Sequence, residues 1–365
     1  MEMIKFPVKG QGIFVFKTAT NFSLYNSAND DGLEIHNGPH GIYVSRISNK
    51  AEYVDTKCRA NSTWFSLDAQ NQCIYAGNGE ARIETVTYKY QFEKNKENKQ
   101  FLESISLISC KPDKIIKDPI TTSIPLAVKS TCTMHEIAHN KYMPKSHLSP
   151  ASQKLYDCIY KTTLNTPDFK DFAKAIDYSI VTPGCWCHEK IKEKSSEFGK
   201  PNIKETYLRI TLGQNNGESP GIPYVMEIWP VDHYSPIHNH AGASAIIHVL
   251  RGKINVSLYP FLGTTIPFGT ADFKKGDITW ISPTLNQTHK LHNKGTKTCI
   301  TLQCYMYEDT DRKHYDYFDY IENTIEDTTG EIKHYEPDSD MDFIEFKKLM
   351  QKEWSTVSML QKLKM

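Results

Sequence analysis

The segment SPIHNHAGASAIIHVLRG, residues 235–252, constrains the fold of this chain more than any other stretch. It places His238 and His240 one residue apart, before a small-residue turn and an apolar run that ends at Gly252. If a strand ends near His240, the two imidazoles point to the same side of it, because side chains alternate along a strand. The segment therefore predicts a strand, a turn at Gly242 and a second buried strand, with both histidines on one inner face.

A metal ion held by this pair needs a third ligand from a later strand. The stretch ISPTLNQTHKLHNKG offers His289 and His292. We prefer His289 because it lies inside the run that resumes a strand, whereas His292 adjoins a turn. His248 lies beyond the turn that follows His240, so we interpret it as structural. Two histidines on one strand and a third on a later strand are typical of a metal site inside a jelly-roll barrel.

Length and composition set the class of protein. A chain of 365 residues exceeds one ordinary domain, so we expect two. Lysine plus arginine and aspartate plus glutamate both number 43, which argues against nucleic acid or an anionic membrane as a partner. No apolar run approaches membrane-spanning length, and the first residues lack the apolar core of a signal peptide. Nine cysteines at irregular spacing fit a set of reduced thiols, so we expect a cytoplasmic protein.

Strand and helix patterns divide the chain into four stretches. Residues 1–125 contain short β-branched and aromatic runs between turn clusters, which predicts a β-sandwich. Residues 126–148 are expected to form a connector, and residues 149–337 a jelly-roll barrel with a few flanking helices. Residues 338–365 predict an amphipathic C-terminal helix packed on the body. The predicted fold is therefore mainly β, with an N-terminal sandwich followed by a barrel.

Residues 207–307 resemble the thiol dioxygenases of the cupin superfamily, above all type I cysteine dioxygenase. The likeness begins with ETYLRITLGQNNGESPGIPYVMEIWPVDHYSPIHNH and continues through GASAIIHVLRGKI, ISPTLNQTHKLHN and CITLQCYMYED. These segments match, in order, a Tyr-x-Arg strand with the His-x-His strand, the next strand, the third histidine, and a strand behind the metal ligands. The resemblance extends over roughly residues 145–335 and leaves the first 125 residues and the tail outside it.

The resemblance implies that residues 149–337 are a cupin domain in which His238, His240 and His289 hold Fe(II). It further implies that dioxygen oxidises L-cysteine, or a related small thiol, to the sulfinic acid. Three neutral imidazoles leave the full divalent charge on the iron, and this charge favours a thiolate as a ligand. Three coordination positions remain for a chelating aminothiol and dioxygen.

The same resemblance assigns the residues around the metal. Arg209 would pair with the substrate carboxylate, with Tyr207 beside it, because a guanidinium matches a carboxylate with two hydrogen bonds. Tyr305 would place a hydroxyl near the thiol and dioxygen as the catalytic residue. Thr301 and Gln303 have the same parity as Tyr305 on one strand, so all three can face the pocket.

Two departures from the family leave a second function open. The family commonly has a serine-histidine-tyrosine relay, whereas this chain has Thr301, Gln303 and Tyr305. Glutamine cannot gain a proton as histidine does, so acid–base work by that relay would be lost. A cysteine that can cross-link to the tyrosine in animal members is matched here by Ala245. The alternative is a non-catalytic, metal-containing cupin that binds a small ligand.

A second histidine motif offers a minor alternative. TMHEIAHNKY contains His135, Glu136 and His139, the pattern with which a helix presents two zinc ligands and a general base. Pro144 closes the segment soon afterwards, and no third ligand presents itself in the sequence. A zinc hydrolase is therefore the third and weakest of the functions that the motifs allow.

Overall fold

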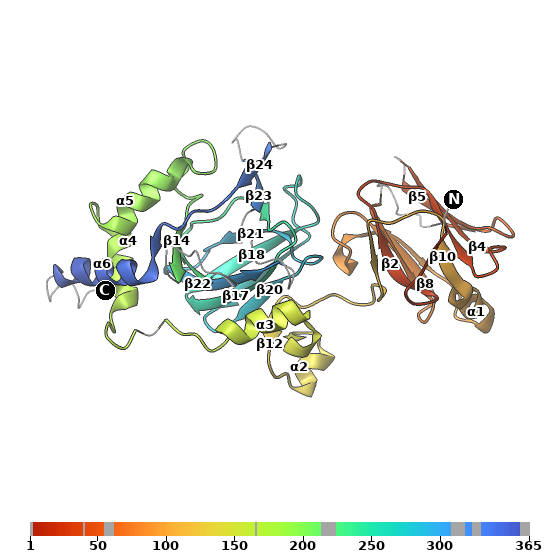
Figure 1. Cartoon of the computed structure of the whole chain (residues 1–365), viewed down its shortest axis with the longest axis horizontal. Helices are drawn as coiled ribbons and strands as arrows, with labels where there is room; N and C mark the ends of the chain where they lie inside the picture. The colour runs from red at the N-terminus through yellow and green to blue at the C-terminus, as the bar shows by residue number, and fades with distance from the viewer. Residues whose placement is uncertain are drawn as a thin grey trace. The chain divides into compact units, whose positions relative to one another are not determined.

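The computed structural model describes residues 3–38, 41–54, 62–164, 166–212, 224–307, 318–322 and 330–357. The chain divides into two compact units, Met1–Ile124 and Pro125–Met365. Each unit is built on two large β-sheets (Figure 1). The mainly β fold that the sequence predicts is confirmed.

The first unit contains a six-stranded and a five-stranded sheet. The six-stranded sheet has the order β1 (Ile4–Lys5), β10 (Ile105–Ile108), β3 (Phe22–Asn26), β4 (Gly32–Gly38), β5 (Gly41–Arg46) and β6 (Glu52–Tyr53). The five-stranded sheet has the order β11 (Lys114–Ile116), β2 (Gln11–Val15), β7 (Trp64–Asp68), β8 (Cys73–Gly77) and β9 (Val86–Gln91). A short 3-10 turn η1 (Ile83–Thr85) precedes β9, and a helix α1 (Lys96–Ser104) lies between β9 and β10.

Both sheets of the first unit contribute to one apolar core. Leu24 and Leu33 from the six-stranded sheet share that core with Phe14 and Phe65 from the five-stranded sheet. All four side chains are fully buried, as expected where two sheets pack face to face. The predicted β-sandwich is therefore the fold of the first unit.

The second unit holds two six-stranded sheets. The first has the order β20 (Ile278–Ile281), β17 (Ser244–Arg251), β22 (Cys299–Met306), β15 (Tyr224–Trp229), β14 (Leu208–Leu212) and β25 (Met341–Asp342). The second has the order β19 (Gly269–Lys274), β18 (Lys253–Tyr259), β21 (Thr288–His292), β16 (His238–Asn239), β23 (Phe318–Ile321) and β24 (Ile332–Tyr335). A two-stranded sheet pairs β12 (Val128–Lys129) with β13 (Met143–Pro144).

The two six-stranded sheets face each other across an aromatic and aliphatic interior. Trp229 and Val249 from the first sheet pack in the same cluster as Ile254, Leu291 and Phe318 from the second. This arrangement is the double-stranded β-helix, or jelly roll, that the sequence predicts. Over the described residues the strands form two opposed sheets rather than one closed barrel.

Helices cover the outer face of the first of these sheets (Figure 1). Ile176, Phe346 and Met350 from the helices pack on Ile210 and Ile228 from the sheet. No helix in the described part of the chain is both long enough and apolar enough to cross a membrane. The helices of this unit are α2 (Met134–Ala138), α3 (Pro150–Ile159), α4 (Phe172–Val181), α5 (Trp186–Glu193) and α6 (Phe343–Ser355), with 3-10 turns η2 (Lys145–His147) and η3 (Lys194–Ser196).

Two segments differ from the division expected from the sequence. Residues 126–148, expected as a connector, fold onto the second unit, where the Thr279 hydroxyl donates to the Leu126 carbonyl oxygen at 2.9 Å. The tail, expected as a helix over residues 338–365, begins instead with strand β25, which pairs with β14 in parallel. The helix α6 starts after it because the Asp342 side chain accepts hydrogen bonds from two backbone N–H groups of the first turn.

Candidate metal centre

A turn between two strands positions the histidine pair. His238 lies on β16, and His240 comes directly after the last residue of this strand. Because side chains alternate along an extended chain, the two imidazoles can point to the same side. Gly242 has a φ of +84°, which favours glycine, and its N–H donates to the Gln287 side chain at 3.0 Å. In the antiparallel pairing of β16 with β21, His238 lies directly opposite His289. Sheet register thus brings together two histidines that are far apart in the sequence.

Three imidazoles converge inside the second unit. The atoms that His238, His240 and His289 could offer to a metal lie within 4.8 Å of one another. Their ring centroids are 4.6 Å to 5.1 Å apart, and all three side chains are buried. Among the residues that the structure describes, this is the one group of histidine, cysteine or carboxylate side chains able to hold an ion. The predicted ligands therefore lie together.

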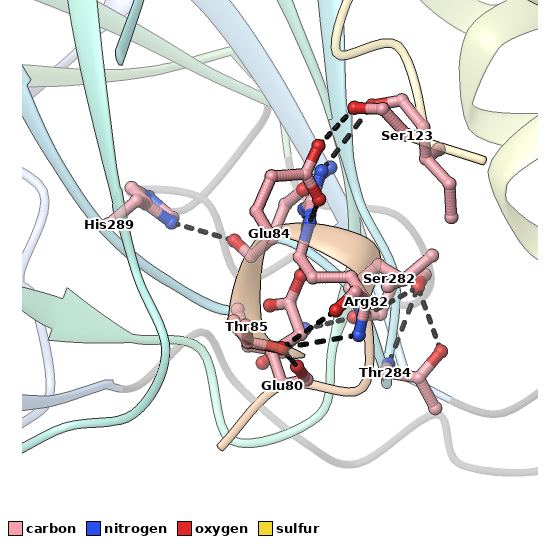
Figure 2. Close-up of polar contacts among 12 residues, drawn as sticks. Glu80, Arg82, Glu84, Thr85, Ser123, Ser282, Thr284 and His289 are labelled. Atoms are coloured by element: carbon pink, nitrogen blue, oxygen red, sulfur yellow. Dashed lines mark hydrogen bonds and ion pairs between the residues drawn. The ribbon is translucent and has the colours of Figure 1, made fainter. Parts of the chain in front are cut away.

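Backbone carbonyl groups orient two of the rings for metal binding. Nδ1 of His238 donates to the Pro236 oxygen at 3.0 Å. Nδ1 of His289, which is labelled in Figure 2, donates to the Asn286 oxygen at 3.1 Å. Because a carbonyl only accepts, Nδ1 carries the proton and Nε2 keeps its lone pair. Within the described residues, the buried Nε2 of His289 has no hydrogen-bond partner. A divalent cation would satisfy that atom.

Burial keeps the imidazoles of His238 and His289 neutral at neutral pH. It lowers the pKa of His289 to about 3, with a smaller contribution from His240. Burial, followed by the charges of His289, His240 and Arg209, holds the pKa of His238 well below its usual range. Metal ligands must be unprotonated, so the environment prepares the histidines for an ion without competition from protons.

Two other histidines and one cysteine of the second unit lie outside the histidine cluster. His248 faces away from the interior, and its Nδ1 donates to the Ile159 oxygen of α3 at 3.1 Å. His292 pairs with Asp232 at 3.1 Å and is not part of the histidine cluster. Cys304, which alternates with Gln303, points away from the interior and hydrogen-bonds the backbone of α3. None of these side chains competes for the ion.

A chain of buried polar side chains leads from Arg209 toward the histidines. Arg209 Nη1 forms an ion pair with Glu227 Oε1 at 3.0 Å. The other oxygen of Glu227 accepts a hydrogen bond from the Gln303 amide, and the Tyr305 hydroxyl donates to the Gln303 carbonyl oxygen. The Tyr305 ring then lies against His240, with centroids 5.2 Å apart. This set of side chains, which we call the polar chain, consists of Arg209, Glu227, Gln303 and Tyr305.

Register explains why these side chains meet. Arg209, Glu227 and Thr301 lie opposite one another across three neighbouring strands, β14, β15 and β22. Thr301 accepts a hydrogen bond from Trp229 Nε1 at 3.2 Å. Tyr207 stacks on Trp229, with centroids 4.3 Å apart, and burial raises its pKa well above the usual value. Tyr207 therefore supports this wall of the interior as a neutral ring.

The position that the resemblance matches to a cross-linking cysteine faces Tyr305. Ala245 on β17 lies directly opposite Tyr305 on β22, and both side chains are buried. The methyl group of Ala245 occupies the position that a cysteine side chain would need in order to form a thioether with Tyr305. Tyr305 therefore has no sulfur at that position, and its hydroxyl is held by Gln303 instead.

The structure adds one charged residue that the sequence analysis overlooked. Glu227 is the one charged residue in the buried strand YVMEIW, and it alternates with Val225 and Trp229 on the same face of that strand. A charge at such a position is the signal by which the sequence could have revealed it. Its carboxylate occupies one side of Arg209, the residue expected to bind a substrate carboxylate. The arginine thus lies in the predicted region with a carboxylate of this chain already beside it.

The HEIAH segment is organised as a helix start. On α2 the Thr133 side chain and Glu136 cap each other's backbone N–H groups, and Lys129 pairs with Glu136 at 2.6 Å. These partners lower the pKa of Glu136 to about 2, which makes it a poor general base. His135 and His139 are exposed, and no third ligand joins them among the described residues. The arrangement does not form a zinc site.

No model of a known protein family matches this chain, and no curated protein matches it either. Solved structures resemble part of it. A cupin sugar phosphate isomerase from Silicibacter pomeroyi is 12% identical, with 36% of this chain and 78% of that chain covered and a TM-score of 0.26. A double-stranded β-helix protein from Klebsiella pneumoniae is 19% identical, with 35% and 89% covered and a TM-score of 0.25. Likenesses this low carry no argument about function.

The fold and the histidine cluster together define the class of domain to which the second unit belongs. The second unit is a double-stranded β-helix, the fold of cupins, with three buried histidines that could hold a metal ion.

Proposed function

We propose that the second unit binds Fe(II) through His238, His240 and His289 and is a thiol dioxygenase. The convergence of three buried imidazoles beside the Tyr305 ring is the observation that carries the proposal. An all-histidine site leaves the charge of the ion uncompensated, which favours an anionic thiolate over a neutral ligand. The resemblance to cysteine dioxygenases adds the reaction class.

The proposed reaction joins one thiol and one dioxygen into one sulfinic acid. Two S–O bonds form, the O–O bond breaks, and sulfur loses the four electrons that dioxygen gains. Iron would supply neighbouring positions for the thiolate and dioxygen. The thiol proton ends on the sulfinic acid or in solvent, so no further oxidant or reductant is required.

The chain's own residues would orient the reactants and exclude water. The carbonyl groups of Pro236 and Asn286 fix two imidazoles, so their Nε2 atoms stay directed at one point. Phe318 covers the site, with its ring centroid 4.7 Å from that of His238. Gln303 holds the Tyr305 hydroxyl through an accepted hydrogen bond and cannot move a proton as histidine does.

The polar chain favours a second candidate, a metal-containing cupin that binds a small ligand without turnover. Gln303 lacks acid–base capacity, and Arg209 is paired with Glu227. A binding protein needs the pocket and the ion but no relay. This candidate predicts tight iron and ligand binding without oxygen consumption.

One experiment separates the two candidates. The full chain is loaded anaerobically with Fe(II), and oxygen uptake and sulfinate are measured with L-cysteine, cysteamine and 3-mercaptopropionate. A dioxygenase consumes one dioxygen for each sulfinate formed and loses both iron and turnover in the His289→Ala variant. Iron bound tightly with no oxygen uptake for any thiol would leave the ligand-binding function.

A further inference from the structure

We propose that Glu227 is a specificity-determining residue that makes the pocket select small aminothiols without a carboxylate. The inference rests on the proposed function and refines its substrate. L-cysteine, the substrate implied by the resemblance, would then be a poorer substrate than an aminothiol with an amide or a hydrogen in that place.

The first observation is the buried ion pair. Arg209 Nη1 and Glu227 Oε1 are 3.0 Å apart, and both side chains are almost fully enclosed. The second oxygen of Glu227 is engaged by the Gln303 amide. Glu227 is therefore held in place from two sides, and its charge offsets that of the guanidinium.

The second observation is the position of the pair. Glu227 lies between Arg209 and Thr301 in the register of three strands whose side chains line the interior. Through Gln303 and Tyr305 it is linked to His240, one of the three histidines. A substrate bound at the histidines and extended toward Arg209 would meet the Glu227 carboxylate as well.

The charge on the substrate decides which thiols can bind beside both Arg209 and Glu227. A substrate carboxylate at Arg209 would share one guanidinium with Glu227 in a site shielded from water, where two like charges are costly. An uncharged amide avoids this repulsion, because its oxygen can accept from the guanidinium while its N–H donates to a carboxylate. An ammonium or a hydrogen at that end is also compatible with the pair.

The test compares thiols that differ at this one group. L-cysteine and L-cysteinamide form the first matched pair, and L-cysteine and cysteamine, which has a hydrogen in place of the carboxylate, form the second. Dissociation constants are measured by anaerobic calorimetry on the Fe(II)-loaded chain, and turnover by oxygen uptake. We expect the carboxylate-free member of each pair to bind at least about tenfold more tightly, the effect of one charge-assisted hydrogen bond. Tighter binding of the carboxylates would overturn the proposal.

The Glu227→Gln variant tests the residue itself. Removing the charge takes away the repulsion between residue 227 and a substrate carboxylate, so the preference within each pair should fall by about tenfold or reverse. A matched control is Glu80→Gln, which breaks the buried Arg82–Glu80 pair of the first unit, 2.9 Å apart (Figure 2). The control should leave thiol selectivity unchanged. If Glu227→Gln does not fold, the wild-type comparison still decides.

The outcomes distinguish the two proposals. Selective binding of carboxylate-free thiols without oxygen uptake would support Glu227 as the selector and contradict the dioxygenase. Turnover with a preference for L-cysteine would support the dioxygenase and contradict the role of Glu227. A folded Glu227→Gln variant that keeps the wild-type preference for carboxylate-free thiols would also contradict the role of Glu227.

Discussion

Two histidine pairs in this chain have spacings that can present metal ligands, and the structure separates them. His135 on the short exposed helix α2 and His139 at the end of that helix have tilted rings with centroids 4.1 Å apart. His238 and His240 lie 4.9 Å apart at the end of β16, where His289 meets them from β21. Spacing brings both pairs together, but enclosure and a third ligand distinguish a candidate metal centre from a helix surface.

The largest expected effect comes from removing the third ligand of the buried site. Replacing His289 with alanine takes away one of three imidazoles, and we expect Fe(II) affinity to fall by more than about 100-fold, because even outer contacts to ligands are worth 10- to 100-fold. Calorimetry and the iron content per chain measure this. A variant that keeps wild-type affinity would show that the triad is not the site.

The buried site should also make stability depend on pH. The pKa of His289 is near 6.5 when unfolded and about 3 when folded, so below pH 6.5 protons bind the unfolded chain preferentially. Its contribution to stability is complete above pH 6.5 and is lost as pH falls toward 3. For metal-free protein, this histidine alone should cost about 2 kcal/mol between pH 7 and pH 5.

Urea unfolding of the second unit at the two pH values measures this loss. The His289→Asn variant provides the reference, since it lacks the titrating group, and it should lose less stability by that amount. Equal losses in both proteins would mean that His289 is not buried as a neutral imidazole.

A smaller effect is expected at the edge of the site. The Tyr305→Phe variant keeps the ring against His240 but removes the hydrogen bond to Gln303. Iron affinity should be unchanged, and turnover should fall about tenfold, the size expected for the loss of one positioning hydrogen bond. Oxygen uptake of the loaded protein measures the fall, and a loss of iron would assign Tyr305 a structural role instead.

The smallest effect is expected in the other histidine pair. The His135→Ala and His139→Ala variants should keep the wild-type iron content, because the exposed rings on α2 have no third ligand within the described residues. The same metal analysis used for His289→Ala measures them. A drop in iron content in either variant would make α2 part of a metal site.

Local periodicity predicted much of this site, and register supplied the rest. Alternation along a strand placed His238 and His240 on one side, and in the structure these two imidazoles lie together with His289. The pairing of Arg209 with Glu227 depends on how β14 and β15 align, and a sequence does not state this register. Glu227 was visible only as a charge in an otherwise apolar strand.

Segment boundaries were harder to predict for a related reason. Residues 126–148 carry no strong pattern, yet they are held by tertiary contacts such as the hydrogen bond from the Thr279 hydroxyl to the Leu126 oxygen at 2.9 Å. Met341 and Asp342 join a sheet edge through β14 before the tail helix begins. Such contacts override local propensity, so the sequence alone could not place these boundaries.

The central claim is that the three histidines support the addition of dioxygen to a thiol. The most direct measurement is the mass of the sulfinate formed by the Fe(II)-loaded chain under ¹⁸O₂, with cysteamine and L-cysteinamide as substrates. The account predicts two labelled oxygen atoms in each sulfinate and one dioxygen consumed per product. Sulfinate with one label or none, or a disulfide and peroxide in its place, would contradict it.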